Sequence, residues 1–198
     1  MERVILASGS GIRKKLLEAA GVSFEVKIAD VDEDAIKAAM SADNLSPHDI
    51  AIALANAKAQ NVGAKNSGAL VIGCDQILEC GGKIYNKPRD KPDAIAQLDQ
   101  LTERQHSLIS AVAIFQNDQP QWCHVTTVKL KMRKVSQQYL ADYVERNWQS
   151  IRNSVGCYNL EEEGSRLFLS VEGDYFSVLG LPLIELLGYL TDRGVLPG

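Results

Sequence analysis

The sequence predicts an α/β fold in which a twisted mixed β-sheet is flanked by helices. Apolar runs of strand length alternate along the chain with segments that have the 3.6-residue period of amphipathic helices. This alternation favours a sheet with parallel strands. Two long strand-like segments, 107–115 and 125–131, are joined by a turn at Asn117-Asp118, so at least one pair of strands is antiparallel and the sheet is mixed.

Apolar runs and helix signals divide the first part of the chain. The run at 4–7 is a short buried strand, and Gly21 ends a helix predicted for 12–20. Residues 24–28 alternate between apolar and polar side chains, as half-exposed strands do. The acidic stretch that follows, 30–34, is predicted to be a loop.

Capping residues mark the start of the next helix. Ser46 and Pro47 are a serine cap and a proline at the first helical position, which is typical of a helix N-terminus. This helix is predicted to run to about Asn66. The apolar run 69–74 is then a central strand, and it delivers Asp75 at its tip.

The second half of the chain is divided in the same way. A helix is predicted for 92–101, where apolar residues recur with a helical period. Ser136 caps a helix that extends to about Asn147. A late strand at 167–171 precedes a last apolar helix, which Pro182 opens.

Length and composition are those of an ordinary globular protein. The chain has 198 residues, 45% hydrophobic and 23% charged, and we expect a single domain spanning 1–198. The formal net charge of −4 and the lack of a basic block argue against a nucleic-acid binder. An anionic substrate therefore needs a local cluster of positive charge.

Neither the cysteines nor the apolar runs indicate a zinc site or a membrane segment. Cys74, Cys80, Cys123 and Cys157 include no C-x-x-C pair, and with three scattered histidines no zinc spacing appears. The start, MERVILASGS, does not match a signal peptide, and no apolar run approaches the ~18 residues of a membrane helix. We expect a cytoplasmic protein.

Polar residues in the loop after the first strand form a candidate phosphate site. No G-x-S-x-G elbow, Walker P-loop or G-x-G-x-x-G is present. Ser8 and Ser10 lie in a glycine-bearing loop before a helix, where backbone N–H groups suit phosphate oxygens. Arg13 opposes the dipole of that helix, which is easier to explain if an anion binds there. Such loops are also common without a phosphate site.

Acidic and basic residues further along the chain could complete this site. Glu33 and Asp75 could hold a hard cation such as magnesium through oxygen ligands, and Asp75 could equally deprotonate a water. Lys58 and Lys87 could neutralise charge that builds on a phosphate chain. Each also has an ordinary explanation, because solvated acidic loops and surface lysines are common.

Several segments, taken in order, resemble the Maf family. They are LASGSGIRKKLLEAAGVSFEV, VDED, ALANAKA, VIGCDQILECGGKIYNKPRD, QLDQLTERQHSLISAVAIF and GDYFSVLGLPLIELL, and they cover essentially the whole chain. The resemblance implies a house-cleaning nucleoside triphosphate pyrophosphatase, which cuts the α–β phosphoanhydride bond with a divalent cation (Mg²⁺ or Mn²⁺). It also implies a fold of the Maf/ITPase type, with two lobes and a central cleft, often in a homodimer.

The resemblance assigns roles to particular residues. Asp75 matches the catalytic acid of the family, and Lys87 matches the lysine of its G-K-P segment, so a hairpin between them would bring both to one cleft. The other matches to site positions are Ser8, Arg13, Glu33 and Lys58. The chemistry agrees with these roles, because attack of water on a shielded phosphorus needs cations and a base.

The chain departs from the family pattern in two places. The family usually reads S-P-R-R where Ser10-Gly11-Ile12-Arg13 stands, so a proline and one arginine are missing. Asn86 replaces the usual glycine before Lys87-Pro88. These changes concern the choice of substrate rather than the core chemistry.

Three positions predict which base is bound. The branch that acts on dTTP and UTP has an arginine at Ile12, a threonine at Gln76 and a glutamine at Glu161, with Glu162 or Glu163 as alternatives for that last position. This chain resembles the branch that acts on 7-methyl-GTP. A carboxylate accepts hydrogen bonds from guanine N1–H and N2–H, whereas a glutamine offers a donor and an acceptor. We therefore expect 7-methyl-GTP as the first substrate.

Three other functions stay open at this point. The chain could be a dTTP/UTP pyrophosphatase of the same family, a non-catalytic protein that senses nucleotides or inhibits septum formation, or a phosphohydrolase that acts on a monophosphate. The presence of Asp75, Lys58, Lys87 and Glu33 argues against a purely binding protein, since binding alone needs no base.

Overall fold

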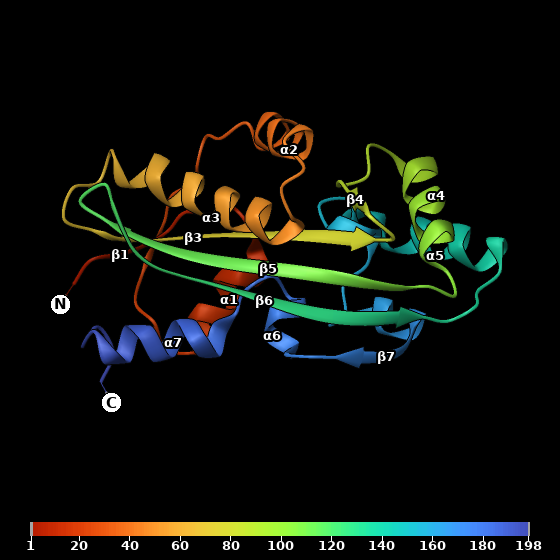
Figure 1. Cartoon of the computed structure of the whole chain (residues 1–198). Coiled ribbons are helices and arrows are strands. Elements are labelled where there is room, and N and C mark those ends of the chain that lie inside the picture. The colour runs from red at the N-terminus through yellow and green to blue at the C-terminus, as the bar shows by residue number, and fades with distance from the viewer. Residues whose placement is uncertain (1, 198) are drawn as a thin grey trace. The chain divides into compact units, whose positions relative to one another are not determined.

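The computed structural model describes residues 2–197. The chain has an α/β fold in which seven strands form one open mixed sheet with helices against it, as predicted (Figure 1). The strand order is β2-β1-β3-β5-β6-β7, and β4 pairs with β3 outside this path. The chain divides into two compact units. Unit 1 contains the chain up to Gln76, Ser110–Thr126 and the residues from Tyr175 onward, and unit 2 contains Ile77–Ile109 and Thr127–Asp174.

Unit 1 has a parallel core at one end of the sheet. Strand β1 pairs in parallel with both β2 and β3, with Ile5 opposite Glu25 and Val71. The elements are β1 (Val4–Leu6), α1 (Gly11–Ala19), β2 (Glu25–Val26), α2 (Glu33–Ala42), α3 (Pro47–Gly63), α6 (Tyr175–Val178), α7 (Leu183–Asp192) and parts of β3 (Leu70–Cys80), β5 (Gln105–Gln116) and β6 (Gln119–Met132).

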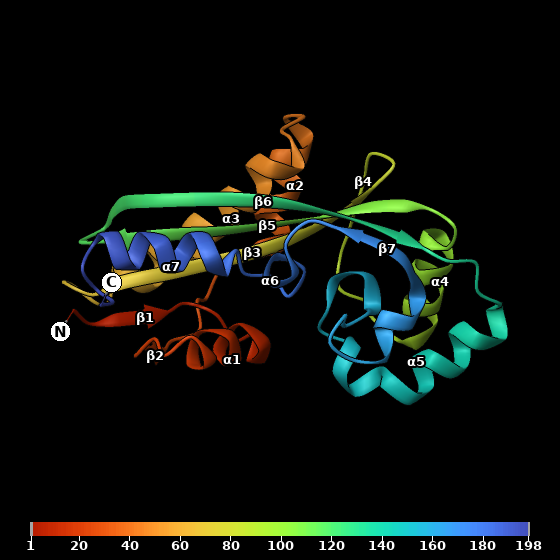
Figure 2. The same cartoon turned by 90° about the horizontal axis from the view of Figure 1, so that it is seen from below.

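Helices cover both faces of the sheet in unit 1. Alternate residues of β1 face opposite sides, as the pleat of a strand requires. Val4 and Leu6 pack in a core with α1 and α7, whereas Ile5 and Ala7 pack in a core with α3. Figures 1 and 2 show α3 on one side of the strands and α7 on the other. Burial on both faces explains why β1 and the first part of β3 are almost entirely apolar.

Unit 2 is built around a cluster of buried rings. His106, Tyr158 and Phe168 have ring centroids within 6 Å of one another, and His106 Nε2 lies 2.7 Å from the Tyr158 hydroxyl. Helix α4 packs against α5 and η1. The elements of unit 2 are β4 (Lys83–Tyr85), α4 (Lys91–Leu101), α5 (Gln137–Ile151), η1 (Val155–Cys157), η2 (Glu163–Leu167), β7 (Phe168–Glu172) and the remaining parts of β3, β5 and β6.

Two predictions about local structure are wrong. Strand β3 does not end before Asp75 but continues to Cys80, because Ile77, Leu78 and Cys80 are also buried. Glu33 does not lie in a loop, because Asp32 caps helix α2 and accepts a hydrogen bond from the Ala35 N–H at 2.9 Å. The acidic residues there belong to a helix N-terminus, where their charge is favourable.

The predicted hairpin between long strands is confirmed. Asn117 and Asp118 have φ values of 52° and 60°, which are the left-handed conformations of a tight turn between antiparallel strands. The caps at Ser46 and Ser136 are also confirmed, since each side chain accepts a backbone N–H three residues later. The single domain and the central cleft stay predictions.

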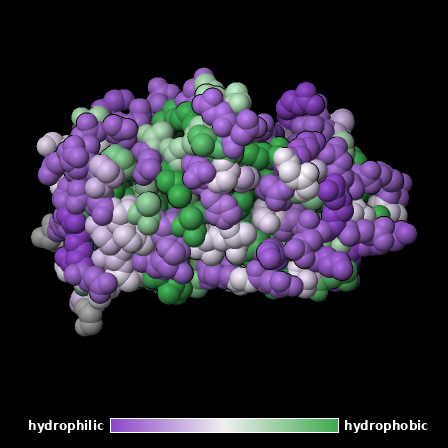
Figure 3. Space-filling view, viewed as in Figure 1, coloured by the Kyte–Doolittle hydropathy of each residue, from purple (hydrophilic) through white to green (hydrophobic). Residues whose placement is uncertain are grey.

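The surface seen in Figure 3 is largely hydrophilic, and the cysteines form no disulfides. Figure 3 shows hydrophilic residues over much of the face viewed in Figure 1. Within residues 2–197, no helix is both long and apolar enough to cross a bilayer. All four cysteines are free, and burial raises the pKa of the Cys74 thiol, which removes it as a nucleophile.

Candidate active site

The loop between β1 and α1 forms one side of the candidate site. Ser8 is buried and lies just after β1, and its hydroxyl accepts a hydrogen bond from the Ser10 N–H at 3.3 Å. Ser10 is not only a loop residue, because its side chain caps α1 and accepts the Arg13 N–H at 3.4 Å. The predicted grouping of Ser8, Ser10 and Arg13 is therefore present within unit 1.

The Arg13 guanidinium connects this loop to two other segments. Its Nη1 donates to the Ser8 hydroxyl at 3.3 Å and to the Cys74 carbonyl at 3.0 Å, and its Nε donates to the Gly180 carbonyl at 2.7 Å. Cys74 immediately precedes Asp75. Gly180 has a φ of 89°, a conformation that favours glycine. Arg13 therefore holds the end of β1, the middle of β3 and the chain before α7 at one place.

The side chains of Lys58, Asp75 and Glu33 meet beside this loop. The Lys58 ammonium lies 2.5 Å from Asp75 Oδ1 and 2.8 Å from Glu33 Oε1. The Lys58 and Asp75 side chains are only 11% and 7% exposed, and that of Glu33 is 29% exposed. The predicted candidates Lys58, Asp75 and Glu33 thus form one cluster, with one cation between two carboxylates.

The local structure explains why Lys58 points inward. Helix α3 buries Leu54, Ala55, Ala59 and Val62 against the sheet, and Lys58 lies on the same face. Its long apolar stem can be buried there while its ammonium reaches a polar partner. A surface lysine, which is the ordinary explanation for this residue, is therefore not what the structure contains.

One oxygen of Asp75 is left without a partner. Asp75 Oδ2 is buried and has no hydrogen-bond partner among residues 2–197, whereas Oδ1 contacts Lys58. A buried carboxylate oxygen that lacks a partner is costly, because its hydration is lost without replacement. Such an atom is available to a proton, to a water or to a cation that arrives with a substrate.

The carboxylates of Glu33 and Asp75 are oxygen ligands of the kind that magnesium prefers, but two carboxylates alone do not fill its coordination sphere. Among the residues described, no group of three His, Cys, Asp or Glu side chains could hold a metal ion. Magnesium is often bound by only one or two carboxylates together with substrate phosphates and waters. The donors present, Glu33 and Asp75, therefore fit a cation that is shared between protein and substrate.

Gln76 is tied to its surroundings by its amide nitrogen. Nε2 lies 3.0 Å from each of the Ser110 hydroxyl, the Ser177 carbonyl and the Val178 carbonyl. Two of these partners are carbonyls, which accept only, so the amide must present its nitrogen to them. The Oε1 atom is then the part of this amide that remains for another contact. These partners are distant from Gln76 in the sequence, so no local pattern predicts them.

Lys87 and Glu161 belong to unit 2. Lys87 follows β4 and is exposed, and Glu161 is exposed in the turn between η1 and η2. Glu162 accepts a hydrogen bond from Asn159 at 3.2 Å. Glu163 forms an ion pair with Arg146 at 2.7 Å, and this hydrogen-bonded pair lowers the pKa of Glu163 to about 2. The convergence of Lys87 and Glu161 with the Asp75 cluster stays a prediction.

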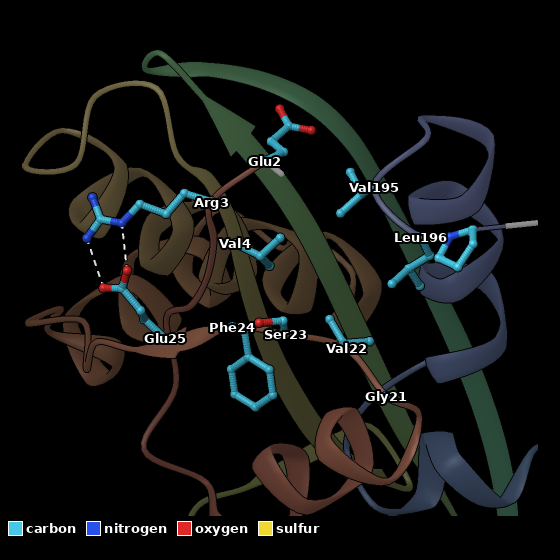
Figure 4. Close-up of a pocket in the computed structure, with 11 residues that line it drawn as sticks. Glu2, Arg3, Val4, Gly21, Val22, Ser23, Phe24, Glu25, Val195 and Leu196 are labelled. Atoms are coloured by element: carbon cyan, nitrogen blue, oxygen red, sulfur yellow. Dashed lines mark hydrogen bonds and ion pairs between the residues drawn. The ribbon is translucent and has the colours of Figure 1, made fainter.

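A pocket elsewhere in unit 1 contains none of the predicted residues. It has a volume of about 380 Å³ and lies beside β1 and β2 (Figure 4). The apolar part of its lining includes Val22, Phe24 and Leu196, and Arg3 and Glu25 form a two-point ion pair at 2.7 and 2.8 Å on its polar side. Arg3 is the only cation among these lining residues and is already paired with Glu25, so the pocket offers no free cation to a phosphate chain.

Comparisons with known proteins show which proteins this chain is similar to. The family described as Maf-like protein matches residues 3–193. A nucleoside triphosphate pyrophosphatase from Ruegeria sp. (strain TM1040) is 52% identical over 98% of this chain and 97% of its own. A 7-methyl-GTP pyrophosphatase from Rhizobium meliloti (strain 1021) is 42% identical over 98% and 97%.

One solved structure is similar to part of this chain. It is a nucleoside-triphosphatase, a dITP/XTP pyrophosphatase, from Mycobacterium abscessus, with 16% identity and a TM-score of 0.37. The match covers 67% of this chain and 75% of that one.

Proposed function

This chain belongs to the Maf family, and on that premise we propose that it is a nucleoside triphosphate pyrophosphatase. It hydrolyses the α–β phosphoanhydride bond and releases a nucleoside monophosphate and pyrophosphate. The observation that carries the proposal is the cluster in which Lys58 contacts Asp75 and Glu33 while Asp75 Oδ2 has no partner among residues 2–197. In an ion pair at the surface, water would hydrate both carboxylate oxygens, and no oxygen would be buried without a partner.

The geometry supports a different role for each of these residues. Asp75 takes a proton from the attacking water at Oδ2, because Oδ1 is held by Lys58. The Lys58 ammonium stabilises negative charge next to the reacting phosphorus. The N-terminus of α1 and the loop around Ser8 supply N–H groups for phosphate oxygens, and Arg13 holds that loop beside Asp75. The resemblance to the family assigns one more cation, Lys87, to the phosphate chain.

A divalent cation is part of the proposal, and Glu33 and Asp75 are the residues that would hold it. When bound, Mg²⁺ or Mn²⁺ neutralises phosphate charge and polarises the bond that breaks. We expect EDTA to abolish turnover and magnesium or manganese to restore it, measured as pyrophosphate release. Glu33→Gln should raise the magnesium concentration needed for half-maximal turnover. Rescue by zinc alone would contradict oxygen ligation.

The proposed substrate is 7-methyl-GTP. A relative with that name is 42% identical to this chain over nearly its full length. Glu162 and Glu163 are engaged by Asn159 and Arg146, whereas Glu161 forms no hydrogen bond or ion pair with any residue in 2–197. Of the three adjacent carboxylates, Glu161 is therefore the one available to the N1–H and N2–H groups of guanine.

A nucleotide panel tests the function. Purified protein with magnesium is incubated with 7-methyl-GTP, GTP, UTP and dTTP, and pyrophosphate and orthophosphate are measured separately. Pyrophosphate alone, with 7-methyl-GTP cleaved fastest, is the expected result. A tenfold preference for UTP or dTTP would overturn the substrate and keep the reaction. Orthophosphate as the product would contradict cleavage of the α–β bond, and binding without turnover would favour a nucleotide sensor.

A further inference from the structure

Strand β3 approaches helix α3 so closely at Gly73 that no side chain fits between them. A β-carbon added there would lie 2.1 Å from the Ala55 carbonyl oxygen, 2.7 Å from Ala59 N and 2.9 Å from Ala59 Cβ. Gly73 is not among the glycines with positive φ. The requirement for glycine is therefore steric rather than conformational, and the atoms in the way belong mostly to the helix backbone.

The helix contributes small residues to the same contact. Positions 51, 55, 59 and 63 of α3 are alanine, alanine, alanine and glycine, and all four are buried. Residues four apart lie on one face of a helix, so this face is nearly free of side-chain bulk. Figure 1 shows α3 lying along β3, which is the arrangement that such a face permits.

The close approach lies directly beside the reactive cluster, which consists of Lys58, Asp75 and Glu33. Gly73 and Asp75 are two residues apart on β3 and point to the same face of the sheet, toward α3. Lys58 immediately precedes Ala59, whose atoms would meet the added β-carbon. The 2.5 Å contact between the Lys58 ammonium and Asp75 Oδ1 therefore joins the helix and the strand next to this close approach.

We propose that Gly73 is a positioning residue, which sets the separation of α3 and β3 at which Lys58 contacts Asp75 and Glu33. The consequence for turnover rests on the proposed function. A methyl group at Gly73 meets backbone atoms, which cannot swing away as a flexible side chain can. Restoring ordinary contact distances requires a shift on the order of 1 Å, and a displacement of that size can lower turnover by about 100-fold.

The test compares two glycine-to-alanine changes at the same interface. A β-carbon at Gly63 would meet nothing closer than Val71 Cγ2 at 3.9 Å, which is ordinary contact. Gly73→Ala is expected to lower kcat by about 10- to 100-fold with a much smaller change in KM. Gly63→Ala is expected to leave both unchanged. Parent-like turnover in folded Gly73→Ala would overturn the proposal.

A double-mutant cycle separates positioning from a general loss of structure. If Gly73 acts through Lys58, then Gly73→Ala lowers kcat little further in a Lys58→Met background, in which the volume of the side chain is kept. If the two changes multiply, Gly73 acts independently of Lys58 and the proposal is wrong. Should Gly73→Ala fail to fold, Ala59→Ser replaces it in both measurements, because it adds one atom at the same contact from the helix side.

A second readout does not depend on turnover. The rate at which an amine-reactive reagent labels Lys58, followed by mass spectrometry, reports whether its ammonium is still enclosed. Labelling is expected to rise severalfold in Gly73→Ala and to stay at the parent rate in Gly63→Ala. Equal labelling in all three proteins would overturn the positioning role. If the parent cleaves no nucleotide, the proposed function fails, and this measurement still decides the role of Gly73.

Discussion

Lys58 and Asp75 form a buried pair whose chemistry depends on both partners. Removing one member of a buried ion pair leaves an uncompensated charge and typically costs about 3–5 kcal/mol. Lys58 also contacts Glu33, so the ammonium keeps one carboxylate when the other is neutralised. Isosteric amides are therefore better probes of this cluster than alanine, because they remove charge and basicity while the shape is kept.

Asp75→Asn tests the base directly. The variant should fold and bind nucleotide like the parent, because the amide fills the same volume, and turnover should fall by about 10²- to 10⁴-fold. Asp192→Asn is the matched control, since Asp192 is exposed at the end of α7 in the same unit. Pyrophosphate release and nucleotide binding are measured on both. Near-normal turnover in folded Asp75→Asn would remove Asp75 as the base.

Glu161→Gln tests the choice of base. A glutamine leaves one guanine donor without a good acceptor, which costs about 1–3 kcal/mol, or roughly 5- to 150-fold. The ratio of kcat/KM for 7-methyl-GTP to that for UTP should fall by this factor. Glu162→Gln should leave the ratio unchanged, because Glu162 is engaged by Asn159. A larger effect at Glu162 would move the assignment to that residue.

At the scale of elements, α2 lies at the surface of unit 1. None of its residues is buried, and it packs against α3. Its first residue, Glu33, contacts Lys58, and its N-cap is Asp32. The position of one member of the reactive cluster therefore depends on how well the first turn of α2 is formed.

Asp32→Ala should loosen that first turn. Loss of an aspartate cap costs about 1 kcal/mol, which corresponds to roughly fivefold faster local opening. Amide hydrogen exchange of residues 33–36 should accelerate by that factor. Asp34→Ala is the control, because it removes an acid from the same turn and leaves the cap intact. Similar exchange in both variants would mean that helix charge, and not the cap, holds the turn.

At the scale of the molecule, the ring cluster of unit 2 makes stability depend on pH. Burial lowers the pKa of His106 to about 4, and its Nδ1 has no hydrogen-bond partner among residues 2–197. Burial also raises the pKa of Tyr158, so this hydroxyl stays neutral. Between pH 6.5 and 4 the unfolded chain binds a proton that the folded chain does not. The free energy of unfolding therefore decreases as pH falls through that window.

His106→Phe should remove this dependence. The parent should lose about 2 kcal/mol of unfolding free energy from this group between pH 7.5 and pH 5, and the variant should not. Urea unfolding at both pH values measures the difference, in which pH-independent losses cancel. Equal slopes in parent and His106→Phe would contradict a neutral buried His106.

Much of the fold follows from signals between residues that are close in the sequence. The caps at Ser46 and Ser136 and the turn at Asn117-Asp118 were predictable because each depends on a few adjacent side chains. The resemblance to the family also identified each residue of the reactive cluster as a candidate. Helix α2 was not predicted, because a solvated loop and a helix N-terminus share the same acidic composition.

The sequence by itself therefore determined most of the elements, the family and the identity of Asp75, Lys58 and Glu33 as candidates. Only the tertiary structure decided that these three meet and that Asp75 lies within a strand rather than at its tip. It also decided that α3 lies too close to Gly73 for any side chain to fit there. The physical reason is distance along the chain. Lys58 and Asp75 are 17 positions apart, and their contact depends on how closely a helix packs on a strand, which no local pattern specifies.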